Sequence, residues 1–264
     1  MTVLSGTALA GKVVLVSGGT QGVGAAAART AARCGAEAVV VTGRRPEVAE
    51  VLVDELDALG TEPLFIRADV AVVDQAVASV AGTVEAFGRV DCVVNAAALT
   101  DRGTLLDTTP EMFDAHVATN LRGPFFVMQA AVRDMLRREA AGTIVNVISI
   151  SAHTGSAILA PYAASKGGLA SLTRNAAHAH RRDRIRVNGL NIGWTATEGE
   201  DVVQRRFHGA QDGWLAEAGR DLPAGRLGDP DEIADMIVYL LSDGSGVVTG
   251  SVIDWDQTVM GGQG

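Results

Sequence analysis

Cysteine and long apolar runs are scarce in this chain of 264 residues, which argues against a metal site built on cysteines and against a membrane span. The two cysteines, Cys34 and Cys92, lack metal-ligand spacing, so we expect small buried residues in a reducing compartment. No apolar run approaches the roughly 18 residues of a membrane span. Residues 1–11 contain no basic segment of the kind that opens a signal peptide. We therefore expect a cytoplasmic protein that does not enter a membrane.

Positively charged residues are also fewer than negatively charged ones. The chain has 22 Lys and Arg residues against 31 Asp and Glu residues, which gives a formal net charge of −9. A surface of that sign repels phosphate backbones, so we expect no nucleic-acid partner. The local exception is the cluster of Arg181, Arg182, Arg184 and Arg186, which follows a predicted helix. Cations are favoured at helix C-termini, and we prefer that interpretation to a phosphate-binding patch.

Apolar residues and glycine, by contrast, are plentiful. Hydrophobic residues make up 47% of the chain and charged residues 20%, which is ample for a buried core. Thirty-one glycines against seven prolines suit a fold with many tight turns between strands and helices. The length would allow two domains, but α/β domains of this size often form one unit.

Short β-branched runs alternate with long alanine-rich segments over the first 190 residues. The runs are almost continuously apolar, as expected for strands covered on both faces. The predicted strands are Lys12–Ser17, Ala38–Thr42, Pro63–Arg67, Val90–Asn95, Gly142–Ile148, Arg184–Leu190 and Ser251–Trp255. The predicted helices are Gly22–Cys34, Pro46–Leu59, Val73–Phe87, Pro110–Arg138, Pro161–His180 and Asp229–Ser242. Pro46, Pro110 and Pro161 suit the first turn of a helix, where the missing N–H costs nothing.

Strands separated by helices imply parallel pairing through right-handed crossovers. We therefore predict an α/β fold with one doubly wound, three-layer domain over residues 1–264 and a mostly or fully parallel seven-stranded sheet. Residues 195–227 interrupt the alternation, because they are polar and contain only weak helical pieces. An insertion at the sheet edge where ligands bind is a candidate substrate lid.

A glycine-rich segment joins the first predicted strand to the first predicted helix. It reads Ser17-Gly18-Gly19-Thr20-Gln21-Gly22-Val23-Gly24. Glycine permits a sharp turn and a close approach of the backbone to a pyrophosphate, and the N–H groups at the helix start favour the anion. A purely structural turn also uses glycine, but the strand before and the helix after favour dinucleotide binding.

The end of the second predicted strand indicates which dinucleotide binds. An acidic residue there would hydrogen-bond the adenosine ribose of NAD, and Gly43 supplies no carboxylate. Arg44 and Arg45 can instead pair with the 2′-phosphate of NADP. We favour NADP(H) over NAD(H), with solvated loop arginines as the alternative interpretation. Asp69 and Val70 end the third strand, where a short carboxylate can meet the adenine amino group.

Ser149, Tyr162 and Lys166 form the second informative pattern. Tyr162 and Lys166 are four residues apart on a predicted helix, so their side chains share one face. A nearby ammonium lowers the pKa of a phenol, which then exchanges a proton near neutrality. Ser149 ends a strand that enters the same crevice and can donate a hydrogen bond to a substrate oxygen. Asn120 is a poor helix former in mid-helix, which favours a water-holding or backbone-bonding role.

Together these motifs resemble the classical short-chain dehydrogenase/reductase family over about Ala10–Asp256. The glycine turn is similar to that family's T-G-x3-G-x-G element, and Tyr162-Ala163-Ala164-Ser165-Lys166 is similar to its Y-x3-K element, with Ser149 at the family's spacing. Asn95-Ala96-Ala97-Ala98 resembles N-N-A-G, and Val187-Asn188 with Ile192-Gly193 and Thr197 resembles V-N…P-G…T.

The resemblance implies a Rossmann fold, secondary alcohol/ketone oxidoreduction and a homotetramer, with a dimer as the alternative. It implies a catalytic set of Asn120, Ser149, Tyr162 and Lys166. The implied cofactor residues are Ser17, Gly18, Thr20, Gln21, Gly22, Val23, Gly24, Arg44, Arg45, Asp69, Val70, Asn95, Tyr162, Lys166, Gly193, Thr195 and Thr197. Departures from the pattern at Ala98, at Ile192 and at Asp256-Gln257-Thr258 affect pocket shape and C-terminal contacts rather than a proton-transfer group.

The substrate is a small molecule that the sequence does not name. Ser151, His153 and Trp194 are candidate substrate contacts, with ordinary packing or solvation as their alternative roles. His178 and His180 point to different faces of a helix, and we expect no metal site. Two other functions stay open: a dinucleotide-binding sensor or scaffold without redox turnover, and a lyase or epimerase that uses bound cofactor without net redox change.

Overall fold

Seven strands form a single parallel sheet in the structure, a computed structural model that describes residues 6 and 8–259. The strand order is β3-β2-β1-β4-β5-β6-β7, and every pair of neighbours is parallel. The strands are β1 (Val13–Ser17), β2 (Ala38–Gly43), β3 (Glu62–Arg67), β4 (Cys92–Asn95), β5 (Gly142–Val147), β6 (Ile185–Ile192) and β7 (Val252–Trp255). The predicted doubly wound, fully parallel sheet is confirmed.

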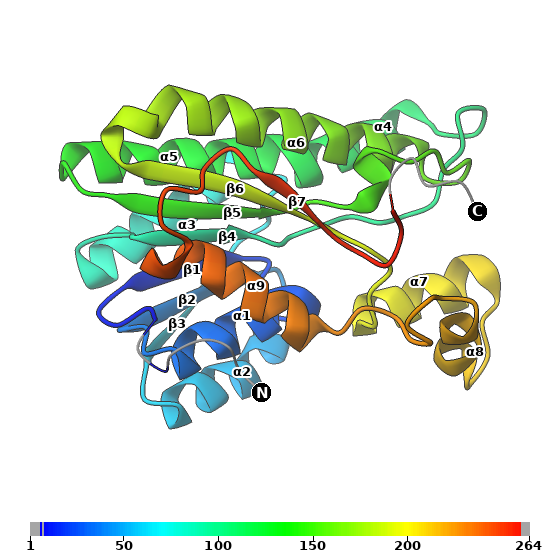
Figure 1. Ribbon diagram of the computed structural model, residues 1–264, viewed down its shortest axis with the longest axis horizontal. Coiled ribbons are helices and arrows are strands. Elements are labelled where there is room, and N and C mark those ends of the chain that lie inside the picture. The colour runs from blue at the N-terminus through cyan, green and yellow to red at the C-terminus, as the bar shows by residue number, and fades with distance from the viewer. Residues whose placement is uncertain (1–5, 7, 260–264) are drawn as a thin grey trace.

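Helices cover both faces of the sheet, which gives three layers (Figure 1). The face packed against α1, α2 and α9 is separate from the face packed against α3, α5 and α6. The helices are α1 (Gly22–Arg33), α2 (Pro46–Ala58), α3 (Val73–Phe87), α4 (Pro110–Val117), α5 (Gly123–Arg137), α6 (Ala160–His180), α7 (Glu198–His208), α8 (Trp214–Arg220) and α9 (Pro230–Leu241). None of these described helices has the length and apolar character that a bilayer crossing requires.

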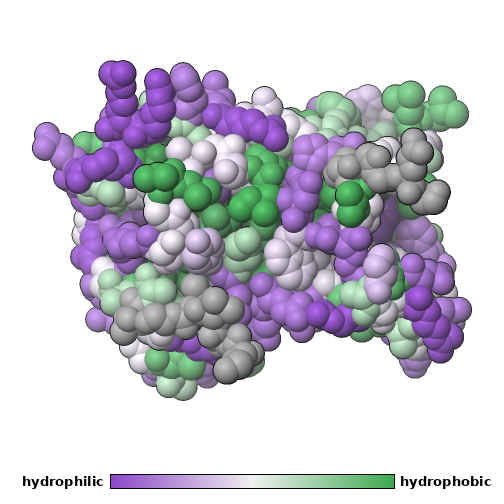
Figure 2. Space-filling view, in the orientation of Figure 1, coloured by the Kyte–Doolittle hydropathy of each residue, from purple (hydrophilic) through white to green (hydrophobic). Residues whose placement is uncertain are grey.

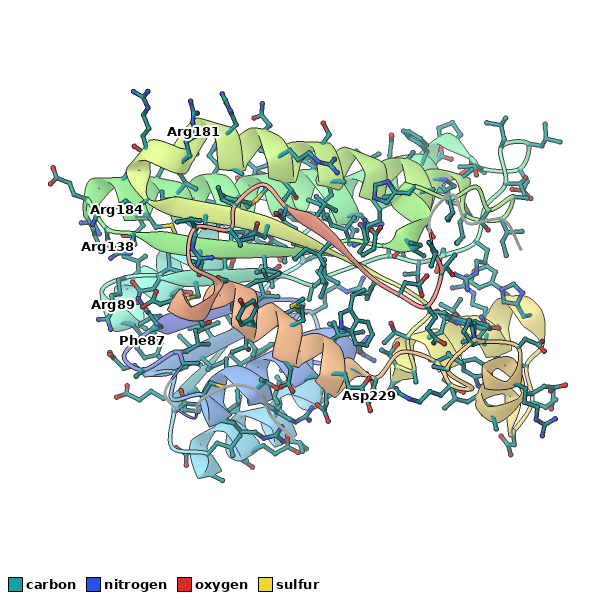
Figure 3. The ribbon with its side chains drawn as sticks, in the orientation of Figure 1. Phe87, Arg89, Arg138, Arg181, Arg184 and Asp229 are labelled. Atoms are coloured by element: carbon teal, nitrogen blue, oxygen red, sulfur yellow. The ribbon has the colours of Figure 1, made fainter. Side chains whose placement is uncertain are left out.

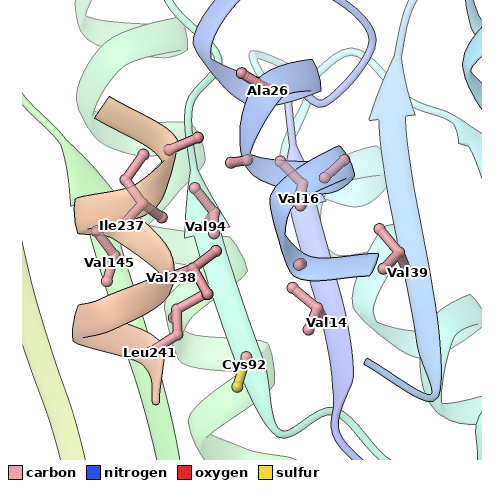
Figure 4. Close-up of a cluster of buried hydrophobic side chains, with 14 of the residues drawn as sticks. Val14, Val16, Ala26, Val39, Cys92, Val94, Val145, Ile237, Val238 and Leu241 are labelled. Atoms are coloured by element: carbon pink, nitrogen blue, oxygen red, sulfur yellow. The ribbon is translucent and has the colours of Figure 1, made fainter. Parts of the chain in front are cut away.

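The central strands are buried on both faces because apolar side chains occupy most of their positions, not only alternate ones. In register, Val14 of β1 lies beside Val39 of β2 and Cys92 of β4. Figure 4 shows these side chains in one buried cluster with those of α9, whose Ile237 and Val238 are fully buried. Burying a side chain of this size stabilises the fold by about 1.5–3 kcal/mol. The β1–β4 pair, around which the site is built, is therefore anchored in the apolar core.

The segment predicted as one α-helix over Pro110–Arg138 is not α-helical throughout, and this prediction is corrected. A π-helical turn at Ala118–Arg122 separates α4 from α5. A single wide turn of this kind adds a residue without ending the helix, so the apolar pattern continues across it. Thr109 caps the start of α4, because its Oγ1 accepts a hydrogen bond from Met112 N at 3.2 Å.

The arginine cluster lies at the opposite edge of the molecule from α7 and α8 (Figure 3). Arg181 Nη1 donates to the main-chain oxygen of His178, and Arg184 Nη2 donates to that of Glu139 at 2.7 Å. Arg186 Nη1 donates to Leu240 O at 3.0 Å. These contacts to main-chain oxygens at chain turns favour the helix-end interpretation over a phosphate-binding patch.

Candidate active site

A pocket of about 750 Å³ opens at the C-terminal edge of the sheet, where ligands of open parallel sheets bind. Its wall combines the turn after β1, the loops after β2, β4, β5 and β6, and parts of α6 and α7. The wall includes these residues predicted from the sequence: Gly18, Thr20, Gln21, Gly22, Val23, Gly24, Arg44, Arg45, Asp69, Val70, Ser149, Ser151, Tyr162, Lys166, Gly193, Trp194, Thr195 and Thr197.

The glycine turn brings bare backbone to the pocket. Gly18 has a φ of 76°, in the left-handed region that favours glycine, and a Cβ there would overlap the backbone of Ala97. A Cβ at Gly24 would overlap the carbonyl oxygen of Gly18. Side chains are thus excluded on both sides of the turn, which leaves the start of α1 accessible to a ligand.

The start of α1 fits the pyrophosphate of a dinucleotide. This helix carries no acidic residue in its described first turn, so nothing there repels an anion. The side-chain oxygen of its N-cap residue, Gln21, accepts a hydrogen bond from Arg45 Nη2 at 2.5 Å instead of capping the helix. The first N–H groups of the helix therefore keep their capacity to bind phosphate oxygens.

The loop after β2 supplies positive charge to the same end of the pocket. Arg44 and Arg45 both line it and are exposed. Asp69 lines the pocket after β3, and its Oδ1 accepts a hydrogen bond from Ala71 N at 3.0 Å. Two arginines and a carboxylate acceptor therefore lie where the adenosine part of a dinucleotide would bind.

Ser149, Tyr162 and Lys166 meet at the other end of the pocket. Ser149 follows β5, and its Oγ accepts a hydrogen bond from Ser151 N at 3.2 Å in a short 3₁₀ turn. Tyr162 and Lys166 lie one turn apart on α6, and Lys166 Nζ is 5.8 Å from the centre of the Tyr162 ring. The three side chains form one constellation although they come from two elements of the chain.

The electrostatics of this constellation differ from the sequence-based expectation. Burial raises the pKa of Tyr162 above its ordinary value, and hydrogen bonding to Ser149 offsets part of that rise. Lys166 is fully buried, donates to Val147 O at 2.8 Å, and has its own pKa lowered by burial to about 8. The expected lowering of the Tyr162 pKa by Lys166 is therefore wrong, because burial disfavours the charged phenolate and raises the pKa instead.

Asn120 is fully buried in the π-helical turn and does not line the pocket. Its Oδ1 accepts from Leu99 N at 2.8 Å, and its Nδ2 donates to Leu99 O at 2.9 Å and to Ser165 Oγ at 3.0 Å. Of the two roles considered for it, these contacts are those of a backbone-bonding residue. Asn120 fastens the loop after β4 to the helix that carries Tyr162.

Three other predicted site residues lie away from the pocket wall. Ser17 is buried in β1, where its main-chain oxygen accepts hydrogen bonds from the loop after β4. Asn95 is buried, and its Nδ2 donates to Asn146 Oδ1 at 2.8 Å, beneath the pocket. His153 is turned away from the pocket toward β6, and its Nε2 lies 2.6 Å from Asn191 Nδ2. Sequence spacing placed these residues near the site but could not set their side-chain directions.

One group of pocket residues was missed by sequence reasoning. Arg102, Glu200, Gln204 and His208 line the pocket. Arg102 lies in the loop after β4 and Glu200 in α7, yet Arg102 Nη2 donates to Glu200 Oε1 at 3.1 Å. A separation of 98 residues leaves no local signal that could have predicted this pair.

Within the described part of the chain, no group of three or more His, Cys, Asp or Glu side chains could hold a metal ion. The two cysteines are buried and free, and burial raises the pKa of both, that of Cys92 to about 11. Neither cysteine lines the pocket.

Comparison with known proteins bears on the identity of this fold and pocket. A family profile described as enoyl-(acyl carrier protein) reductase matches residues 18–258. L-rhamnose 1-dehydrogenase (NAD(P)(+)) of Azotobacter vinelandii is 38% identical over 247 residues, which cover 91% of this chain and 93% of that protein. The A-factor type gamma-butyrolactone 1′-reductase of Streptomyces virginiae is 36% identical and covers 96% of this chain and 97% of its own.

Solved structures agree with these relatives. An actinorhodin polyketide ketoreductase variant crystallised with NADPH superposes with a TM-score of 0.88 at 31% identity, covering 94% of this chain and 96% of its own. Each of these proteins is an oxidoreductase by name, and each matches nearly its whole length. The chain belongs to the classical short-chain dehydrogenase/reductase family.

Proposed function

We propose that this protein is an NAD(P)-dependent oxidoreductase that interconverts a secondary alcohol and a ketone, with Tyr162 as general acid and base. The observation that carries the proposal is the meeting of Ser149, Tyr162 and Lys166 in the pocket that the glycine turn also lines. A dinucleotide-binding sensor would need the glycine turn but not these three side chains. An epimerase or lyase would use them without consuming cofactor.

In the direction of reduction, Tyr162 gives its phenolic proton to the carbonyl oxygen of the substrate. When bound, the reduced nicotinamide supplies the hydride to the carbonyl carbon, and the oxidised form accepts it in the reverse reaction. Ser149 donates a hydrogen bond to the same oxygen and stabilises the charge that develops on it. In oxidation, the phenolate of Tyr162 takes the hydroxyl proton.

Lys166 and Asn120 act around this step. The Lys166 ammonium would bind ribose hydroxyls of the cofactor beside Tyr162. Its fixed position, held by Val147 O, supports this role. Asn120 is a positioning residue that keeps the loop after β4 and α6 together, as its contacts with Leu99 and Ser165 suggest.

NADP(H) is the favoured cofactor within this proposal. Arg44 and Arg45 would pair with its 2′-phosphate, and no carboxylate of β2 faces them because Gly43 ends that described strand. Ser17 and Asn95, which lie beneath the pocket, would shape the turn rather than touch the cofactor. Gly193, Thr195 and Thr197 line the nicotinamide end and complete the proposed binding set.

We also propose a cytoplasmic homotetramer, with a dimer as the alternative. Phe113 of α4 and Phe125 of α5 are exposed, as are Tyr239 of α9 and Val247 before β7. Figure 2 shows hydrophobic side chains gathered in the middle of the face that carries α9 and β7. Apolar surface on two sides of the molecule supports an assembly with two kinds of contact. Light scattering would measure the particle mass.

The proposed function is tested by a panel of secondary alcohols, ketones and sugars, assayed in both directions with NAD(H) and NADP(H). Stoichiometric change in the absorbance of the reduced cofactor is expected for at least one pair. Cofactor binding without any turnover would favour the sensor. Conversion of substrate without net cofactor change would favour the epimerase or lyase.

A further inference from the structure

A network of polar side chains lines the pocket where the loop after β4 meets α7. Glu200 Oε1 accepts hydrogen bonds from Gln204 Nε2 at 2.7 Å, from Trp194 Nε1 at 2.8 Å and from Arg102 Nη2 at 3.1 Å. All four residues line the pocket that contains Tyr162. One carboxylate oxygen is thus the common acceptor for donors from α7, from the loop after β6 and from the loop after β4.

The second oxygen of this carboxylate is different. Among residues 6 and 8–259, no hydrogen bond reaches Glu200 Oε2. Asn95 Oδ1 and Asn191 Oδ1 are the buried, unpaired side-chain atoms in the same part of the chain, so Oε2 is not sealed in the interior. An accessible oxygen on a carboxylate that is otherwise fixed by three donors is a preorganised acceptor for a ligand hydroxyl.

The charge at this end of the pocket is balanced. Besides Glu200, the Arg102 guanidinium contacts Thr100 O at 3.0 Å and His208 Nε2 at 3.2 Å. The side chains of Arg102 and Glu200 are 15% and 14% exposed, so they are poorly hydrated. An anionic substrate would need a cation that is not already paired. An apolar substrate would remove water from this ion pair without offering it a hydrogen bond.

Trp194 adds an apolar surface beside the carboxylate. Trp194 is 39% exposed, and its indole stacks on Trp214 of α8, with ring centroids 6.0 Å apart. Trp214 Nε1 donates to Asp201 Oδ1 at 2.7 Å, so α7 fixes both indoles. A rigid aromatic ring next to a carboxylate suits a ring that is apolar on its faces and hydroxylated at its rim.

The network is also close enough to Tyr162 to act on the same substrate. The negative charge of Glu200 raises the pKa of Tyr162 and the positive charge of Arg102 lowers it, both as smaller effects than burial. Because Tyr162 and Glu200 line the same pocket, a substrate whose reacting oxygen meets Tyr162 can present another substituent to Glu200.

We infer that the substrate is an uncharged, polyhydroxylated compound such as a sugar or polyol, an inference that rests on the proposed function. Glu200 Oε2 accepts a hydrogen bond from one of the non-reacting hydroxyl groups of this substrate. Glu200 is then the residue that separates hydroxylated substrates from simple cyclic alcohols. Arg102 holds Glu200 in place and cancels its charge.

The test compares neutral aldoses and polyols, uronic acids and cyclohexanol as substrates of the wild-type protein and of Glu200→Gln. We expect neutral aldoses or polyols to have the highest kcat/KM in the wild type. Glu200→Gln should lose about tenfold to hundredfold in kcat/KM for them, mainly through KM, since a hydrogen bond to a charged group is lost. Because the substitution frees the guanidinium of Arg102, the ratio of uronic acid to neutral aldose activity should rise.

Two further variants separate recognition from a merely structural effect. Glu198→Gln removes the same charge from the same turn of α7 at an exposed position outside the pocket and should change kcat/KM by less than about threefold. Glu200→Asp keeps the charge beside Arg102 but shortens its reach. It should melt at the wild-type temperature and still lose activity on neutral aldoses.

Binding to the protein saturated with NADP⁺, measured by calorimetry on the same panel, separates this inference from the proposed function. Binding of neutral aldoses without turnover would support the recognition and refute the redox activity. Turnover with cyclohexanol preferred, or an equal loss on all substrates in Glu200→Gln, would keep the redox activity and overturn the recognition. Absence of both binding and turnover for every hydroxylated compound would also overturn it.

Discussion

Lys166 Nζ donates a hydrogen bond to the main-chain oxygen of Val147 at 2.8 Å, in a position where the lysine is 2% exposed. Burial lowers the pKa of this amine from 10.5 to about 8. At neutral pH the fold therefore holds a charge that is better solvated in the unfolded chain. The catalytic role proposed for Lys166 has a cost in stability.

That cost gives the first prediction. Lys166→Met should raise the free energy of unfolding at pH 7 by about 1–3 kcal/mol. A shift of one pKa unit corresponds to ~1.4 kcal/mol, and loss of the hydrogen bond to Val147 offsets part of the gain in stability. The folded-state pKa is the lower one, so the penalty is complete below about pH 8 and disappears as pH rises through 10.5. Urea unfolding from neutral to alkaline pH would show whether the difference in unfolding free energy between Lys166→Met and the wild type becomes smaller.

Lys12→Met is the matched control, since Lys12 is the other lysine of the chain. It should change stability by less than about 0.5 kcal/mol. A Lys166→Met protein that is less stable than wild type at pH 7 would contradict the account of the buried charge.

The raised pKa of Tyr162 gives a second prediction. The chain has two tyrosines, Tyr162 and Tyr239, so tyrosinate absorbance in Tyr239→Phe reports Tyr162 alone. Without cofactor, its midpoint should lie above the ordinary 10.0, because burial is the largest influence. The phenol should accordingly serve as a proton donor at neutral pH, and alcohol oxidation should speed up as pH rises into the alkaline range. A midpoint below 10.0 without cofactor would contradict the burial argument.

Cofactor preference supplies a third prediction. Arg44→Gln should raise the KM for NADP(H) about tenfold to hundredfold, since a charge-assisted contact with the 2′-phosphate is lost. The KM for NAD(H) should stay nearly the same because that cofactor lacks the phosphate. Steady-state kinetics with both cofactors would measure the change in their ratio. Equal effects on both would show that Arg44 does not read the phosphate.

A fourth prediction separates backbone strain from crowding at the glycine turn. Gly18 and Gly60 both have positive φ values, 76° and 83°, but a Cβ at Gly60 meets nothing within 4 Å. Gly60→Ala should therefore cost about 1–2 kcal/mol, the strain term alone. Gly18→Ala should cost at least about 1–3 kcal/mol more and should weaken dinucleotide binding, because its Cβ overlaps Ala97. Equal costs for the two variants would refute the close approach.

Most of the fold could be predicted from sequence because the buried parallel strands are short, mostly apolar runs separated by helical segments. The predicted strand Gly142–Ile148 differs from β5 by one residue, and the insertion at 195–227 contains α7 and α8 as short helices. The π-helical turn at Ala118–Arg122 could not be predicted, since one extra residue barely disturbs the apolar period.

The parts of the site whose backbone position is fixed by a motif could be predicted from the sequence. The parts that depend on side-chain direction or on burial could not. The glycine turn and the i,i+4 pair Tyr162 and Lys166 fix position, and both line the pocket. His153 shares the same loop as Ser151 but turns toward Asn191. The pair of Arg102 and Glu200 depends on packing between distant segments. The direction of the Tyr162 pKa shift depends on burial, which spacing does not show.

The most direct test of the central claim is the turnover of Tyr162→Phe with a substrate that the wild type converts, with Tyr239→Phe as control. Dinucleotide affinity, measured separately, should be nearly unchanged in both variants. Turnover should fall about 10²–10⁴-fold in Tyr162→Phe, the usual worth of a general acid, and stay near wild type in Tyr239→Phe. A Tyr162→Phe protein that keeps near-wild-type turnover would contradict the claim that this phenol carries the proton.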